Sequence, residues 1–151
     1  MDRLSTVMVR TSLIWLLGGF VLGGAMLTDR ELAGDWRLWM GPSHAHMLFV
    51  GWFLQFALGV AYWLLPRKRS PDRPLGYHYR AAFLAVVTLN LGLLLRVVAE
   101  PVERTGNQGA WTVAALSGSA LLQLGAVVIF VVQLWPRVAT RPVRPNRTNQ
   151  A

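Results

Sequence analysis

The sequence has no cysteine, few acidic residues and only three histidines. The absence of cysteine excludes disulfides, thiolate metal sites and covalent haem attachment through a Cys-x-x-Cys-His motif. Seven acidic residues stand against 15 lysines and arginines, which gives a net charge of +8. The basic residues flank apolar segments and form no continuous face, so membrane topology explains them better than nucleic-acid binding does.

Apolar residues dominate the rest of the chain. With 54% hydrophobic residues and a mean hydropathy of +0.39, the 151 residues are too apolar for an ordinary soluble domain and too few for two domains. The charges are bunched between four apolar runs, each long enough to cross a hydrocarbon core of roughly 30 Å as a helix. We predict an all-α integral membrane four-helix bundle, formed by one domain over 1–136 and followed by a disordered basic tail over 137–151. The helices are expected at about 11–28, 43–65, 81–99 and 110–135.

The distribution of basic residues predicts how the bundle is oriented. Lysines and arginines concentrate in the N-terminal tail, in the loop 67–80 and in the C-terminal tail. The loops on the other side hold only Arg30, Arg37 and Arg104. By the positive-inside rule, both termini face the cytoplasm, and the protein is expected to be a multi-pass protein of the cell inner (cytoplasmic) membrane.

Prolines mark the expected ends of two helices. Pro42 and Ser43 precede the second apolar run, with Ser43 as a candidate N-cap. Pro136 is expected to end the last helix, and Pro101 to lie in the loop 100–108.

The main candidate residues for a functional site lie in the stretch 41–67. His44 and His46 open its apolar run at one membrane face, and ionisable groups at membrane depth indicate a site by default. A 3–4 spacing places one set of residues on a shared helix face: His44, Met47/Leu48, Gly51, Gln55 and Leu58/Gly59. Gly51 would leave room on that face for a flat cofactor beside His44, whereas His46 points roughly the other way.

Three further residues bear on this site. Met26 is expected near the outer end of the first helix, at about the depth of His44. Arg96 lies in the last turn of the third helix on the same side, where it pairs with Glu100 at i+4, meets an anionic group of a cofactor, or does both. His78 lies in the basic loop at the opposite membrane face, so it is expected to be an interfacial residue and not a ligand.

His44-Ala45 followed by Tyr62-Trp63-Leu64-Leu65-Pro66 resembles the second helix of haem-copper oxidase subunit I and of the nitric oxide reductase large subunit. In that family a histidine at the outer end of the helix ligates the low-spin haem. The chain is also similar to small oxidase subunit I-like proteins, and the run from His44 to Phe49 is similar to NnrS-like membrane haem proteins. The resemblance implies a haem b held by His44, with His46, Arg96, Gly51 and Met26 as candidate residues around it. It implies electron transfer, or sensing of haem or a gaseous ligand.

The resemblance does not extend to the catalytic centre of the oxidases. The later helices that carry the copper ligands and the second haem are missing, so we expect neither oxygen reduction nor another enzymatic activity from this chain alone. The second axial ligand stays open between Met26, a histidine of a second copy, and none. The expected partners are the lipid bilayer and either further copies of the chain or a respiratory-chain complex, and no nucleic acid.

Two alternatives use the same residues differently. Met40, His44, His46 and Met47 form a cluster of thioethers and imidazoles that suits copper, which would make the protein a copper-binding or metal-handling protein of the outer face. Alternatively, both histidines hydrogen-bond to neighbouring helices, and the protein is a structural membrane subunit without a cofactor.

Overall fold

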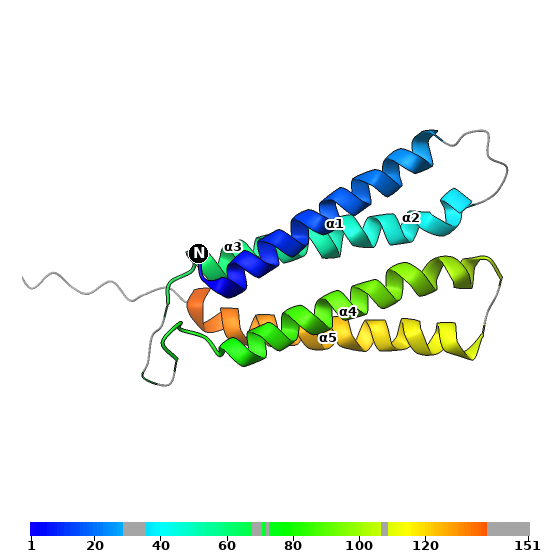
Figure 1. Cartoon of the computed structure of the whole chain (residues 1–151). Coiled ribbons are helices and arrows are strands. Elements are labelled where there is room, and N and C mark those ends of the chain that lie inside the picture. The colour runs from blue at the N-terminus through cyan, green and yellow to red at the C-terminus, as the bar shows by residue number, and fades with distance from the viewer. Residues whose placement is uncertain (29–35, 68–70, 72, 107–108, 139–151) are drawn as a thin grey trace, which may run out of the picture.

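The computed structural model describes residues 1–28, 36–67, 71, 73–106 and 109–138. The elements are α1 (Arg3–Thr28), α2 (Trp36–His46), the π-helix η1 (Met47–Leu54), α3 (Gln55–Leu64), α4 (Tyr79–Arg104) and α5 (Ala110–Val138). α2, η1 and α3 follow each other without a break and form one rod (Figure 1). This rod, α1, α4 and α5 are each long and apolar enough to cross a membrane, so the expected all-α, multi-pass membrane architecture is confirmed.

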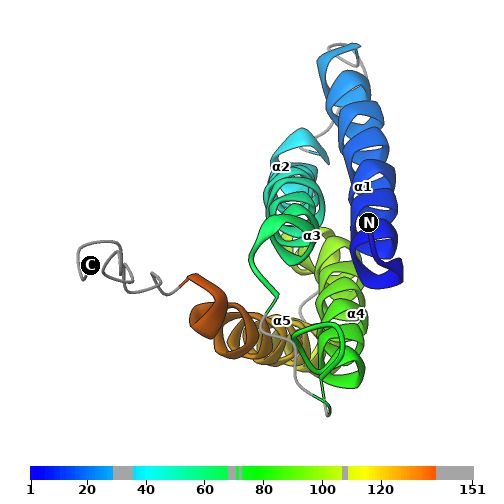
Figure 2. The same ribbon diagram turned by 90° about the vertical axis from the view of Figure 1, so that its left-hand side faces the viewer.

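The four helices form two hairpins, α1 with the rod and α4 with α5 (Figures 1 and 2). α1 packs along η1 and α3, whereas α4 packs on both α2 and α5. We call the end with the start of α1 and the end of α5 the basic end, and the end with α2 the histidine end. α1 diverges from α2 toward the histidine end (Figure 1).

Several helices are longer than the sequence predicted, because prolines do not end them. Ser43 is no N-cap: α2 starts at Trp36 and continues through Pro42, and the Ser43 hydroxyl donates to the Val97 carbonyl at 3.2 Å. α4 likewise runs through Pro101 and α5 through Pro136. A proline removes only one backbone N–H, whereas a continuous helix pairs most of the other backbone polar groups. Because unpaired backbone groups are costly in an apolar environment, the continuous helix is favoured.

The N-terminal helix also starts earlier than the expected residue 11. The Ser5 amide donates to Asp2 Oδ1 at 2.9 Å, so Asp2 caps the first turn. Of the predicted tail, residues 137 and 138 belong to α5, and 139–151 lie outside the described residues.

The π-helix η1 directly follows His46. Its eight residues exceed the single turn that most π-helical segments reach, and such segments are frequent at functional sites. The pattern of apolar residues does not distinguish a π-helix from an α-helix, so a continuous helix was all that the sequence predicted here.

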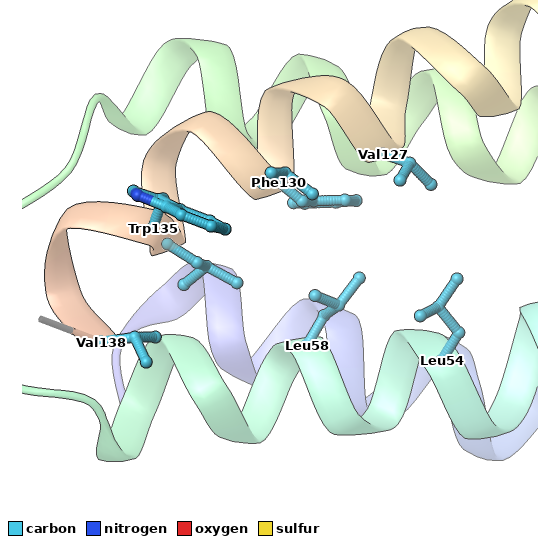
Figure 3. A pocket seen from close by; sticks show the side chains of 8 residues that line it. Leu54, Leu58, Val127, Phe130, Trp135 and Val138 are labelled. Atoms are coloured by element: carbon cyan, nitrogen blue, oxygen red, sulfur yellow. The ribbon is translucent and has the colours of Figure 1, made fainter.

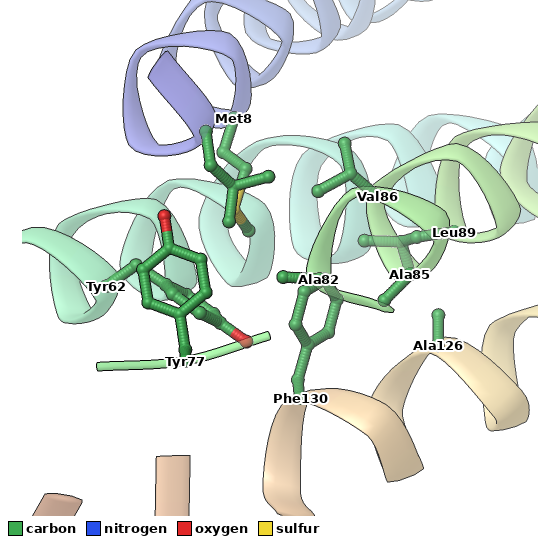
Figure 4. Close-up of a cluster of buried hydrophobic side chains, with 10 residues drawn as sticks. Met8, Tyr62, Tyr77, Ala82, Ala85, Val86, Leu89, Ala126 and Phe130 are labelled. Atoms are coloured by element: carbon green, nitrogen blue, oxygen red, sulfur yellow. The ribbon is translucent and has the colours of Figure 1, made fainter. Parts of the chain in front are cut away.

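The buried core lies mainly toward the basic end, where side chains from α1, α3, α4 and α5 meet around Tyr62 and Phe130 (Figure 4). Elsewhere the helices expose large apolar side chains, as expected for contact with lipid.

A polar network joins α1, α3 and α4 inside the bundle. Asn90 Oδ1 accepts from Trp15 Nε1 at 2.8 Å, and Asn90 Nδ2 donates to Gln55 Oε1 at 2.8 Å. Gln55 Nε2 donates to the Met8 carbonyl at 3.2 Å, so both amides are satisfied.

Candidate functional site

His44 projects from α2 onto a glycine-lined part of α1. Its Nδ1 lies 2.9 Å from the carbonyl oxygen of Gly19. A carbonyl only accepts, so Nδ1 carries the proton and Nε2 keeps its lone pair. No residue in the described part of the chain hydrogen-bonds to Nε2. The contact fixes both the tautomer and the orientation of the ring.

Gly23 makes this position of the imidazole possible. A Cβ at Gly23 would lie 2.7 Å from His44 Cε1, closer than real Cβ contacts. One turn earlier, Gly18 and Gly19 accept the side chains of Met47 and Leu48 in the same way. The glycines of α1 therefore allow close packing of the rod, and at Gly23 the group that packs is the histidine ring.

An open groove of about 610 Å³ lies beside His44 at the histidine end, where α1 and α2 diverge. Its wall is apolar apart from His44 and Arg37, and the remaining lining comes from Phe20, Gly23, Gly24, Met26, Leu27 and Leu48. Met26 and His44 thus line one groove. A Cβ at Gly24 would meet nothing within 4 Å, so the groove is open over that part of α1.

His46 faces a different helix from His44. Its Nδ1 lies 2.8 Å from the Pro42 carbonyl and 3.8 Å from Glu100 Oε2 on α4. Glu100 is 8% exposed and gathers cations, because Arg96 Nε lies 3.3 Å and Arg104 Nη2 lies 3.9 Å from its carboxylate. His46 therefore belongs to an ion-pair cluster between α2 and α4.

Arg96 makes the i+4 pair with Glu100 that the sequence suggested, and it does not line the groove. The arginine of the groove is Arg37, which the sequence predicted to lie in a loop because Pro42 was expected to start the helix. With the helix beginning at Trp36, Arg37 is a helical residue on the same element as His44.

Gly51 lies buried where η1 meets α1 and α4. A Cβ there would approach Trp15 Cγ to 2.6 Å and Leu93 Cδ2 to 2.8 Å. Trp15 and Leu93 occupy the space beside Gly51, which serves close helix packing in this structure.

The residues of the copper alternative point to different neighbours. Met47 reaches Gly18 on α1, His44 packs on Gly23 of α1, and His46 faces Glu100 on α4. Within the described ranges, no group of three His, Cys, Asp or Glu side chains could hold a metal ion. His78 is exposed and precedes α4 at the basic end, far along the bundle from His44.

Comparisons with known proteins gave no match, whether to a protein-family model, to a curated protein or to a solved structure.

Proposed function

We propose that the chain is a membrane-embedded b-type haem-binding protein in which His44 is the iron ligand. The observation that carries this proposal is the hydrogen bond from His44 Nδ1 to the Gly19 carbonyl. Histidines that ligate metals typically donate their second ring nitrogen to such an acceptor, which orients the ring and raises its basicity as a ligand. Haem iron is commonly held by one such imidazole, and a chain without cysteine would hold the haem non-covalently.

The groove fits the size and polarity of a haem. Its volume of about 610 Å³ lies within the roughly 300–1,000 Å³ that is usual for ligand pockets. Phe20, Leu27 and Leu48 provide apolar contacts for a flat ring, and Gly24 leaves the helix surface open. Arg37 borders the groove, where its guanidinium suits a propionate carboxylate.

Each residue then has a defined task. His44 binds the iron, Gly19 holds the imidazole through its carbonyl, and Gly23 provides the space for the ring. Met26 offers a thioether in the same groove and is our candidate for a second residue that would hold the iron. A bound haem would supply one-electron transfer or binding of a gaseous ligand.

The finer topology and assembly belong to the same proposal. The excess of arginine and lysine at the basic end supports cytoplasmic termini and a location in the inner membrane. The groove is open on one side, so a second copy or a respiratory-chain partner would cover the exposed edge of the haem. This supports an oligomer or a complex as the working unit.

The optical spectrum of the protein purified with haem tests the proposal. We expect sharp reduced-state bands for the wild type, their loss in His44→Ala, and an unchanged spectrum in His78→Ala. The second variant is the matched control, because it removes an imidazole at the opposite end of the bundle. A colourless wild type that contains stoichiometric copper would overturn the haem proposal and favour the metal-handling alternative.

A further inference from the structure

The last turn of α5 carries a buried guanidinium at the basic end. Arg137 is 3% exposed. Its Nη2 donates to the carbonyl oxygens of Tyr62 at 3.0 Å and Leu65 at 2.6 Å, and its Nε donates to the Pro66 carbonyl at 3.2 Å. The side chain thus crosses from α5 to the end of α3, where helix carbonyls lack partners within the helix.

No carboxylate of the described residues forms a salt bridge with this guanidinium, although Asp2 at the same end of the bundle attracts it electrostatically. In the described part of the chain, no acidic side chain lies within 4.0 Å of the Arg137 guanidinium. Asp2 lies at the same end but is paired with Arg67 at 3.2 Å. Arg137 Nη1 is buried and has no hydrogen-bond partner there. Neutral carbonyls leave the net charge in place, and a buried unbalanced charge is costly.

Two tyrosine rings lie beside the guanidinium, and the Tyr77 hydroxyl interacts with the Asp2 carboxylate. Among the described residues, further buried side-chain polar atoms without a hydrogen bond lie at the basic end, in Ser5, Tyr62, Gln133 and Arg137. The guanidinium carbon lies 5.6 Å from the ring centre of Tyr62 and 5.9 Å from that of Tyr77. Both tyrosines belong to the cluster in Figure 4. Within the part of the chain that the structure describes, the buried Nη1 of Arg137 is a charged donor without an acceptor, which suits an oxyanion.

An apolar groove between the rod and α5 leads to this cluster. It measures about 580 Å³ and runs along Leu54 and Leu58 on one side and the last turns of α5 on the other (Figure 3). The contacts of Arg137 with Tyr62 and Leu65 lie one to two turns further along the rod, so the guanidinium lies at the end of the groove. Phe130 lines the groove and also packs on Tyr62, with ring centres 6.1 Å apart.

The side chains at the mouth of the groove leave room for a headgroup to enter. Trp135 and Val138 border the groove beside Arg137 and are 77% and 66% exposed. They are not held by packing, so turning them aside toward lipid costs little.

We propose that this groove and Arg137 bind an anionic phospholipid, with an acyl chain along the groove and the phosphate accepting from Arg137 Nη1. A phospholipid matches both parts of the site, because headgroups lie at the level of helix ends while acyl chains lie along the helices. A second copy of the chain could fill the groove. It would bring no obvious anion, however, since the described acidic side chain at this end, Asp2, is already paired with Arg67.

Native mass spectrometry of the purified protein tests this site. The probes are phosphatidylglycerol and phosphatidylcholine with identical acyl chains. We expect the wild type to prefer phosphatidylglycerol by about tenfold or more, as a charge-assisted hydrogen bond would give. Arg137→Gln should lose the preference. Arg80→Gln should keep it, because Arg80 is an exposed cation at the same end of the bundle. Val131→Trp should weaken binding by filling the groove without changing the guanidinium.

Four results would overturn the proposal. They are equal binding of the two lipids, an equal loss in Arg80→Gln and Arg137→Gln, undiminished binding in Val131→Trp, and competition by glycerol phosphate as strong as that by the lipid. The last result would mean a site for free phosphate. A dimer without lipid preference that Val131→Trp dissociates would identify the groove as an interface between copies. If Arg137→Gln does not fold, the Arg80 and Val131 variants decide the question.

Discussion

At the histidine end a carboxylate is surrounded by cations, whereas at the basic end a cation is buried without a carboxylate. Glu100 lies within 4 Å of His46, Arg96 and Arg104. Arg137, by contrast, binds only backbone carbonyls, and its Nη1 has no partner in the described part of the chain. The first arrangement pairs its carboxylate directly with two guanidinium groups, whereas the second has no direct salt bridge among the described residues.

The two ends also present opposite chemistry to a ligand. His44 offers a lone pair on Nε2 beside one groove, while Arg137 offers an N–H at the end of another. A lone pair suits a metal-centred cofactor and a guanidinium N–H suits a phosphate. Each end of this small bundle thus has a groove beside or leading to one oriented polar side chain, His44 at one end and Arg137 at the other.

The largest expected effect concerns which end faces the cytoplasm. Cytoplasmic reporters fused after Ala151 or within 67–80 should be active, and those within 29–43 inactive, because the basic residues concentrate at one end. The reporter activities measure this directly. The reverse pattern would place the His44 groove on the cytoplasmic side and remove the support that topology gives to the oxidase resemblance.

The next prediction compares two glycines of α1, one that contacts the His44 imidazole and one that only borders the groove. Gly23→Ala should weaken haem binding by about 100-fold, as losing the support of a metal ligand does, because the new Cβ would lie 2.7 Å from His44 Cε1. Gly24→Ala is the matched control on the neighbouring residue, where a Cβ meets nothing within 4 Å. Haem titration followed by absorbance measures both. Equal affinities in the two variants would mean that His44 is not the ligand.

His46→Ala should have a smaller effect on the same titration, about tenfold, through loss of its contact with Glu100 and loosening of α2. The iron ligand itself would remain. Complete loss of haem in this variant, with His44→Ala retaining it, would exchange the roles of the two histidines.

The smallest effect concerns the charge cluster at the histidine end. Glu100→Gln should lower the free energy of unfolding by about 1–2 kcal/mol, because it leaves Arg96 and Arg104 facing a neutral amide. Glu103→Gln, three residues along α4 and outside the cluster, should change it by less. Denaturant unfolding in mild detergent provides the values. A stability equal to the wild type would show that the cluster contributes nothing measurable.

Local sequence signals were sufficient to predict the four helices but not the residues at which they begin and end. The four apolar runs predicted four spanning helices, because their length and hydropathy leave few other ways to pair the backbone in lipid. The starts and ends were misjudged at Pro42, Pro101 and Pro136, where the helices continue. The 3–4 spacing predicted that His44, Gly51 and Gln55 share a helix face, and in the structure all three contact α1.

The sequence by itself determined that this chain is a bundle of apolar helices with His44 and His46 at one end and most of its basic residues at the other. Only the tertiary structure decided which atoms those residues meet. The Gly19 carbonyl that orients His44 lies 25 residues away, and the carbonyls that hold Arg137 lie 71 to 75 residues away. Such contacts depend on how two helices cross and diverge, and periodicity within one helix carries no information about its neighbour.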